Sequence, residues 1–89
     1  MRFRFSPEVE TDIKKLKSKS PKAFELLKKQ LVLFENDSTH PSLRIHKLSG
    51  KMHGVWSLSI GLKLRLLFFV KDGEAWGYAI GTHDEVYRK

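Results

Sequence analysis

The sequence contains no cysteine, and this absence excludes several kinds of chemistry. Disulfide bonds, cysteine-bearing zinc sites and a thiol nucleophile are ruled out, which fits a protein of the cytoplasm. The sequence also lacks any apolar run near the roughly 20 residues that a membrane-spanning helix needs. Met1 to Ser6 alternates charged and aromatic residues, unlike a secretory signal peptide. We therefore expect a cytoplasmic protein without a membrane segment.

Acidic residues are few compared with basic ones. The 89 residues include 10 acidic and 17 basic side chains, which give a formal net charge of +7. Such an excess attracts polyanions, usually nucleic acid, and it also suits an acidic protein partner or a solvated basic surface. The length predicts a single domain, residues 1–89, with one modest core.

The first half of the chain predicts a strand followed by two helices. "MRFRFS" alternates arginine and phenylalanine, which is typical of a strand. Ser6-Pro7 and Ser20-Pro21 each supply a capping serine and a proline suited to the first helical position. Apolar residues at three- and four-residue steps predict one buried face on each helix. We expect the many lysines of these helices to lie on solvated outer faces; a docking surface for RNA phosphates is the alternative.

The second half predicts strands at 54–60, 64–70 and 75–80, with a short extra strand allowed at 43–47. The predicted fold is α+β in the order β-α-α-β-β-β, with a mainly antiparallel sheet and both helices packed on one face. Asp72-Gly73 predicts a tight hairpin turn. The segment from Ile80 onward is expected to be loop or chain end.

Strand registers follow from the turns. A three-residue loop at Gly61 to Lys63 places Ser57, Ser59 and Arg65 on the face without helices, whereas a two-residue loop would bury both serines. Strict alternation from the Asp72-Gly73 turn predicts the following pairs: Val70 with Ala75, Phe69 with Trp76, Phe68 with Gly77, Leu67 with Tyr78, Leu66 with Ala79 and Arg65 with Ile80.

Arg65 is the first candidate for a functional residue. An arginine among apolar neighbours in a central strand is costly unless something pairs with it, and its planar fork suits a phosphate. A structural salt bridge to Asp84 or Glu85 is the alternative. His83 and Tyr87 follow the last strand and are expected to come close to Arg65.

The segment "LRIHKLSGKMHG" is the second candidate. It contains Arg44, His46, Lys47, Lys51 and His53. RNA can be cut without a metal when a base removes the 2′-OH proton, an acid protonates the leaving 5′ oxygen and a cation stabilises the phosphate. Histidine suits either proton-transfer role.

Zinc binding is the competing explanation for the histidines. His46, His53 and His83 would be the ligands, but their spacing matches no known metal motif and no cysteine is available. We therefore expect no metal and no cofactor.

The blocks "IHKLSGKMHGVWSLSI", "KLRLLFFV" and "IGTHDEVY", in this order, resemble the RelE/ParE toxin superfamily of toxin–antitoxin systems over nearly the whole chain. The pattern is most similar to the RelE, YoeB and YafQ branch of mRNA endonucleases. The resemblance implies a metal-independent ribonuclease that acts on mRNA in the ribosome. It also implies an antitoxin partner, which we expect to be acidic, and we expect the free toxin to be a monomer.

Matched by position, the resemblance implies roles for individual residues. His46 would be the general base, Arg65 would stabilise the scissile phosphate, and His83 would be the general acid. Tyr87 would orient or stack on the substrate. The substrate-binding residues would be Arg44, Lys47, Lys51 and His53.

The sequence departs from the family pattern at two positions, and two alternative functions remain. Ser57 and Ser59 stand where many relatives carry basic residues or histidine. A ParE-like toxin that acts on DNA gyrase would share the fold, although His46, Arg65 and His83 argue against it. A non-catalytic member that binds RNA or protein would also share it.

Overall fold

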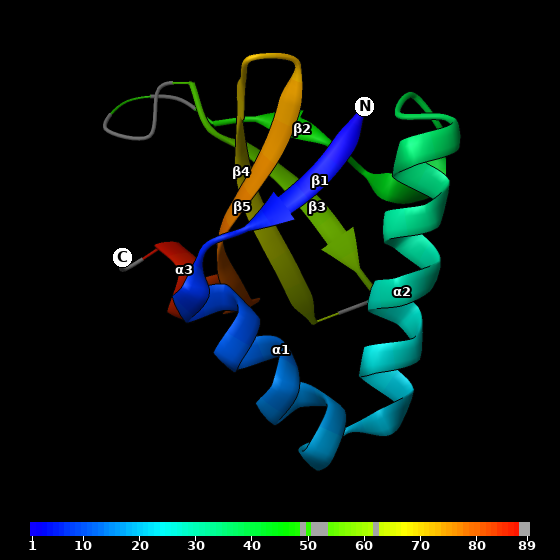
Figure 1. Cartoon of the computed structure of the whole chain (residues 1–89), viewed down its shortest axis with the longest axis vertical. Coiled ribbons are helices and arrows are strands. Elements are labelled where there is room, and N and C mark those ends of the chain that lie inside the picture. Colours follow the sequence, from blue (N-terminus) through cyan, green and yellow to red (C-terminus); the bar gives the residue numbers. More distant parts are fainter. Residues whose placement is uncertain (49, 51–53, 62, 88–89) are drawn as a thin grey trace.

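A five-stranded sheet with two long helices on one face forms the structure, a computed structural model that describes residues 1–48, 50, 54–61 and 63–87 (Figure 1). The elements are β1 (Arg2–Phe5), α1 (Pro7–Lys19), α2 (Pro21–Asn36), the 3-10 turn η1 (Pro41–Leu43), β2 (His46–Lys47), β3 (Trp56–Ile60), β4 (Leu64–Lys71), β5 (Glu74–Thr82) and α3 (His83–Tyr87). The sheet order is β1-β5-β4-β3-β2; β1 runs parallel to β5 and the other pairs are antiparallel. The predicted α+β fold is confirmed.

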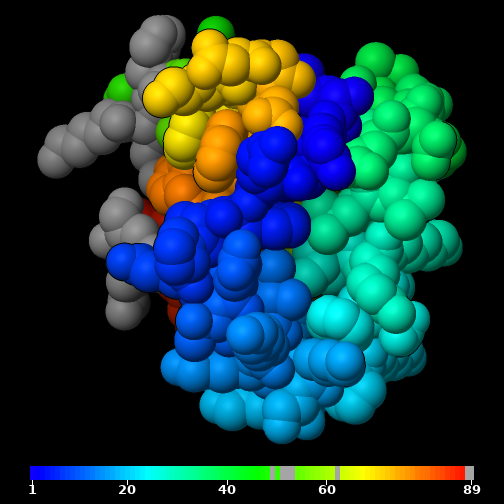
Figure 2. Space-filling model, viewed as in Figure 1, coloured from blue at the N-terminus to red at the C-terminus, as the bar shows by residue number. Residues whose placement is uncertain are grey.

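Both long helices begin where the serine-proline pairs predict. The Ser6 hydroxyl accepts a hydrogen bond from the Val9 amide at 3.3 Å, and the Ser20 hydroxyl accepts one from the Ala23 amide at 3.4 Å. Each serine therefore satisfies a backbone donor that the first helical turn leaves free. In the space-filling view the two helices form one continuous surface beside the sheet (Figure 2).

The main core lies between these helices and the sheet. Three aromatic rings form its centre: the Phe3, Phe34 and Phe68 centroids lie 4.9 to 5.4 Å apart in edge-to-face contacts. Gly77 lies beneath Phe5, where a Cβ atom would come within 2.9 Å of the phenylalanine ring. The absence of a side chain at Gly77 is therefore what lets Phe5 approach the sheet.

The lysines of α1 and α2 are exposed, as expected for solvated outer faces. Lys17 and Lys28 hold their ammonium groups over the Phe24 ring, at 5.4 and 5.2 Å from its centroid. Such contacts cover part of the apolar surface between the two helices while the charge stays in water.

Two of the predicted turns are confirmed. Ile60 pairs with Leu64, so the β3–β4 loop has three residues. Asp72 and Gly73 both have positive φ, 53° and 75°, as a two-residue type I′ hairpin requires. The short strand allowed at 43–47 is reduced to β2, because η1 occupies its first residue.

The predicted β4–β5 register is right near the turn and wrong beyond it. Phe68 pairs with Gly77 as expected, but a β-bulge then shifts the register, so that Arg65 pairs with Gly81 instead of Ile80. Leu67 and Leu66 are shifted in the same way, to Ala79 and Ile80. The bulge leaves one residue of β5, Tyr78, without a partner in β4. As a result the large Ile80 side chain points into the main core.

The prediction of a loop or chain end from Ile80 onward is also wrong. β5 continues to Thr82, and the helix α3 follows. Glu85 accepts a hydrogen bond from the Thr82 amide at 2.8 Å, and the Thr82 hydroxyl accepts one from the Glu85 amide at 3.3 Å. This reciprocal pair is a capping box, and it explains why "THDE" begins a helix.

Side chains of α2 bind backbone groups at both edges of the sheet. The Gln30 amide nitrogen donates to the Ser42 carbonyl at 3.1 Å and to the Ser59 carbonyl at 2.9 Å, which joins α2, η1 and β3. At the other edge the Phe3 amide donates to the Glu35 carboxylate at 3.0 Å. These contacts fix α2 across the sheet.

Replacing Gln30 with leucine tests the first of these contacts. Gln30 is 8% exposed, so Gln30→Leu leaves two carbonyls without their donor and lowers the free energy of unfolding by about 1–3 kcal/mol. Urea denaturation measures the change. Val32→Ala, on the exposed side of the same helix, is the control and is expected to change stability by less than about 0.5 kcal/mol. Equal effects of the two substitutions would contradict the structural role of Gln30.

Candidate functional site

The sheet face opposite α1 and α2 carries a second apolar cluster, and we call this surface the α3 face. The cluster consists of Leu48, Val55, Leu67, Tyr78, Ala79, Val86 and Tyr87. Because directly paired residues of an antiparallel sheet point to the same side, the pairing of Ser57 with Leu67 places the serine there as well. The short helix α3 lies on this face through Val86, which is fully buried.

Arg65 lies in β4, the middle strand of the sheet, between Ser59 on β3 and Gly81 on β5. Its side chain is half-buried, and its Nη1 atom is buried without a hydrogen-bond partner among the described residues. None of the ion pairs found in that part of the chain joins Arg65 to Asp84 or Glu85. The Nη1 atom of Arg65 therefore keeps a donor without a partner in that part of the chain.

His83 and Tyr87 form a pair of contacting, tilted rings at the edge of the α3 face. His83 begins α3 two residues after Gly81, the strand partner of Arg65. The centroids of the His83 and Tyr87 rings lie 4.2 Å apart at an interplanar angle of 46°. The His83 side chain is 72% exposed, with Nδ1 3.6 Å from the Asp84 carboxylate. Tyr87 thus contacts an imidazole that solvent can reach.

His46 lies on β2, at the edge of the sheet, and is exposed. It pairs with Ser57, so its side chain points to the α3 face. Lys47 pairs with Trp56 and points to the opposite side, with its ammonium group 5.9 Å from the Trp56 ring. The structure therefore brings His46, and not Lys47, onto the same face as Arg65 and His83.

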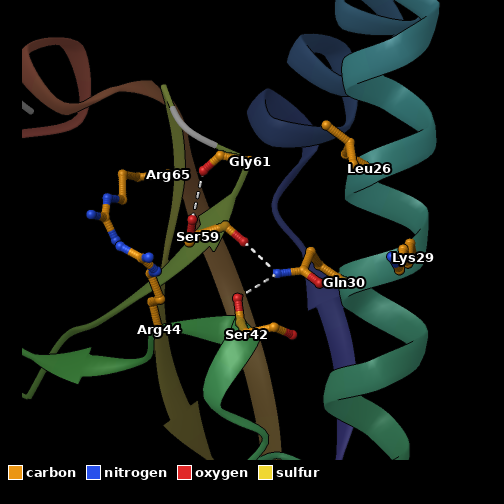
Figure 3. A pocket seen from close by; sticks show the side chains of 8 residues that line it. All are labelled: Leu26, Lys29, Gln30, Ser42, Arg44, Ser59, Gly61 and Arg65. Carbon is orange, nitrogen blue, oxygen red and sulfur yellow. Dashed lines mark hydrogen bonds between the residues drawn. The ribbon is translucent and has the colours of Figure 1, made fainter.

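Arg65 also lines a cavity of about 280 Å³ at the β3 edge of the sheet (Figure 3). The other lining residues are Leu26, Lys29, Gln30, Ser42, Arg44, Ser59 and Gly61. Figure 3 shows the Arg44 and Arg65 guanidinium groups pointing toward one another. The cavity thus unites two of the arginines selected from the sequence, and it does not include His46 or His83.

Tyr78 is a polar component of the α3 face that the sequence did not indicate. Burial raises the pKa of the Tyr78 phenol above its usual range, and the neighbouring Tyr87 adds to this rise. The phenol therefore stays protonated in neutral solution and keeps its hydrogen-bond donor.

Three further residues beside the site had no functional role in the prediction from the sequence. Ser57 is fully buried, and its hydroxyl has no hydrogen-bond partner among the described residues. Lys29 and Gln30 reach the Arg65 cavity from α2. The signal for Gln30 was present, because it is a polar residue within the apolar stripe of the second helix. Lys51 and His53, both expected to bind substrate, lie outside the described residues.

No three His, Asp or Glu side chains in the described ranges come close enough together to hold a metal ion. The zinc alternative also involved His53, which those ranges do not include. None of the described helices combines the length and hydrophobicity that crossing a membrane requires.

Known protein structures resemble this chain closely in fold. No family model and no curated protein sequence matches it. A YoeB/ParE toxin from Agrobacterium tumefaciens superimposes with a TM-score of 0.80 at 15% identity, over 93% of this chain and 99% of that chain. YafQ from E. coli strain BL21(DE3) gives 0.78 at 20% identity, over 98% and 99%. The YoeB–YefM complex from Staphylococcus aureus gives 0.77 at 20% identity, over 93% and 97%. The chain therefore has the RelE/YoeB/YafQ-type toxin fold.

Replacing Arg65 with methionine tests whether its charge is kept at a cost to stability. Arg65→Met removes a buried nitrogen that lacks a partner and keeps most of the side-chain volume, so the free energy of unfolding is expected to rise by about 1 kcal/mol. The matched control is Arg4→Met in β1, which removes an arginine bonded to Glu74 at 2.6 Å and gives no such gain. Thermal and urea denaturation measure both. A loss of stability in Arg65→Met larger than that in Arg4→Met would show that Arg65 is a structural residue.

Proposed function

We propose that this chain, which has the fold of the YoeB and YafQ toxins, is the toxin of a toxin–antitoxin system and a metal-independent mRNA endonuclease. The observation that carries the proposal is the half-buried Arg65 on the α3 face, whose Nη1 atom has no hydrogen-bond partner among the described residues, with an exposed histidine on either side of it along the sheet. A cationic donor of this kind suits an anionic ligand.

The proposed reaction needs a base, an acid and a cation. His46 accepts the proton of the ribose 2′-OH, and the 2′ oxygen attacks the adjacent phosphorus. Arg65 stabilises the negative charge that develops on the phosphate oxygens. His83 donates a proton to the departing 5′ oxygen, so the products carry a 2′,3′-cyclic phosphate and a 5′-hydroxyl. Tyr87 contacts the His83 ring and holds the imidazole in place. Its own ring offers a surface on which a nucleobase can stack.

The proposed substrate is mRNA in the translating ribosome, and the proposed partner is an antitoxin. The net charge of +7 favours binding to ribosomal RNA. One structural neighbour is a complex of E. coli DinJ with YafQ, and another is the YoeB–YefM complex. We propose an acidic antitoxin that covers the α3 face, since carboxylates there would satisfy Arg65.

Histidine substitutions test the chemistry. His46→Ala and His83→Ala are each expected to reduce mRNA cleavage in translating ribosomes at least about 100-fold, because each removes a proton-transfer group. Both side chains are exposed, so stability should change little. Cleavage is measured by primer extension, with thermal denaturation as the folding check.

The control for this experiment is His40→Asn. His40 is an exposed histidine whose Nδ1 accepts a hydrogen bond from the Ser42 amide at the start of η1, a role that asparagine can retain. Full activity in His40→Asn, with loss in the other two variants, supports the proposal. Intact cleavage in both His46→Ala and His83→Ala refutes the acid–base roles. Poisoning of DNA gyrase without RNA cleavage would identify a ParE-like toxin instead.

Salt dependence tests the basic surface as the element that docks on the ribosome. The association constant for ribosomes is expected to fall steadily as salt rises, because each lysine–phosphate contact releases a counter-ion, with a logarithmic slope of about −0.7 to −0.9 per contact. Co-sedimentation across a salt series measures it. Association that is insensitive to salt would contradict electrostatic docking.

A further inference from the structure

The cavity at the β3 edge gathers positively charged side chains. Lys29, Arg44 and Arg65 supply three cationic side chains from three different elements. Among the described residues that line it, none carries a carboxylate. The Arg44 and Arg65 guanidinium groups point toward one another (Figure 3). Like charges that face each other repel, and an anion between them removes that repulsion.

The backbone around the cavity is fixed by contacts that do not involve the cations. Gln30 ties α2 to η1 and β3 through its bonds to the Ser42 and Ser59 carbonyls. Arg44 has φ 46°, in the left-handed region, and its amide donates to the Pro41 carbonyl at 3.1 Å. A non-glycine residue in this conformation is uncommon and is held by its surroundings. The backbone from which the Arg44 side chain extends is therefore fixed before any ligand binds.

The cavity continues the candidate catalytic surface, because Arg65 belongs to both. At about 280 Å³ it lies near the lower limit of ordinary ligand pockets, which suits a phosphate with its sugar better than a whole folded segment. Planar guanidinium groups bind phosphate oxygens through paired hydrogen bonds. An RNA strand whose scissile phosphate contacts Arg65 would therefore continue toward Arg44.

We propose that this cavity is a second phosphate subsite, in which Arg44 and Lys29 bind the backbone phosphate of a nucleotide next to the cleaved bond. The subsite rests on the proposed ribonuclease function, and it adds the residues that position the RNA strand. Arg44 and Lys29 act by binding, and neither transfers a proton. An adjacent subsite of this kind fixes the register of the strand over His46 and His83.

The test uses a short RNA that cannot be cleaved. A nine-nucleotide 2′-O-methyl RNA lacks the attacking 2′-OH, so its binding does not depend on catalysis. Its affinity is measured by fluorescence anisotropy for wild type, Arg44→Gln and Lys29→Gln. The control is Lys22→Gln, which removes the same charge from the same helix outside the cavity. Each of the first two variants is expected to weaken binding about tenfold, and the control less than twofold.

Single neutral methylphosphonate groups, placed at each position of the RNA in turn, then locate the phosphate. Neutralising the bound phosphate weakens binding to wild type more than binding to Arg44→Gln, because the variant has already lost the Arg44 contact and keeps only that of Lys29. Coupling at one position supports the subsite. Equal losses in Arg44→Gln and Lys22→Gln, or no position that couples to Arg44, overturn it.

Two further measurements separate the related outcomes. If Arg44→Gln weakens binding of inorganic phosphate but no RNA position couples, the cavity takes a free anion and the RNA subsite is overturned. Wild-type cleavage of unmodified mRNA is scored separately. Its absence refutes the proposed ribonuclease, whereas the methylphosphonate coupling alone decides the subsite.

Discussion

The β-bulge in β5 is the constraint on which the candidate site depends. Beyond it the pairing of β4 with β5 is shifted by one residue, so Arg65 lies opposite Gly81. Without the shift, the bulky Ile80 would flank the arginine and its side chain would leave the main core. The bulge also turns Tyr78 and Ala79 toward the same cluster, on which α3 then packs. One extra residue thus sets the core, the neighbours of Arg65 and the starting point of His83.

The α3 face keeps polar groups unsatisfied where an ordinary sheet would have apolar contacts. The Arg65 Nη1 atom and the Ser57 hydroxyl are both buried and lack partners in the described part of the chain. Buried polar groups of this kind destabilise a protein, and they are typical of surfaces arranged for a ligand. The centre of the main core, by contrast, consists of closely packed aromatic rings. The proposed ligand-binding groups and the aromatic centre of the main core therefore lie on opposite faces of one sheet.

Much of the fold was predictable because its signals are local. The serine-proline pairs and the Asp72-Gly73 turn each act within a few residues, and the structure confirms both. Alternation predicted the β4–β5 register only from the turn to Phe68. The bulge was not predictable by alternation, since its cause is the fit of Ile80 and Tyr78 to opposite faces of the sheet. The capping box of α3 was visible in "THDE", but these residues were interpreted as catalytic groups or salt-bridge partners and not as the start of a helix. For the site, the shared face of Ser57, Ser59 and Arg65 followed from register, whereas the face of His46 and the contribution of Lys29 and Gln30 required the structure.

The position of α2 across the sheet has a consequence for how other chains can attach. A sheet edge normally offers free amides and carbonyls to an incoming strand. Here Gln30 occupies a carbonyl at the β3 edge and Glu35 occupies an amide of β1, so one helix interrupts both borders. A strand that approached the sheet at Ser59 or Phe3 would have to break these bonds, so α2 disfavours strand addition at these two positions.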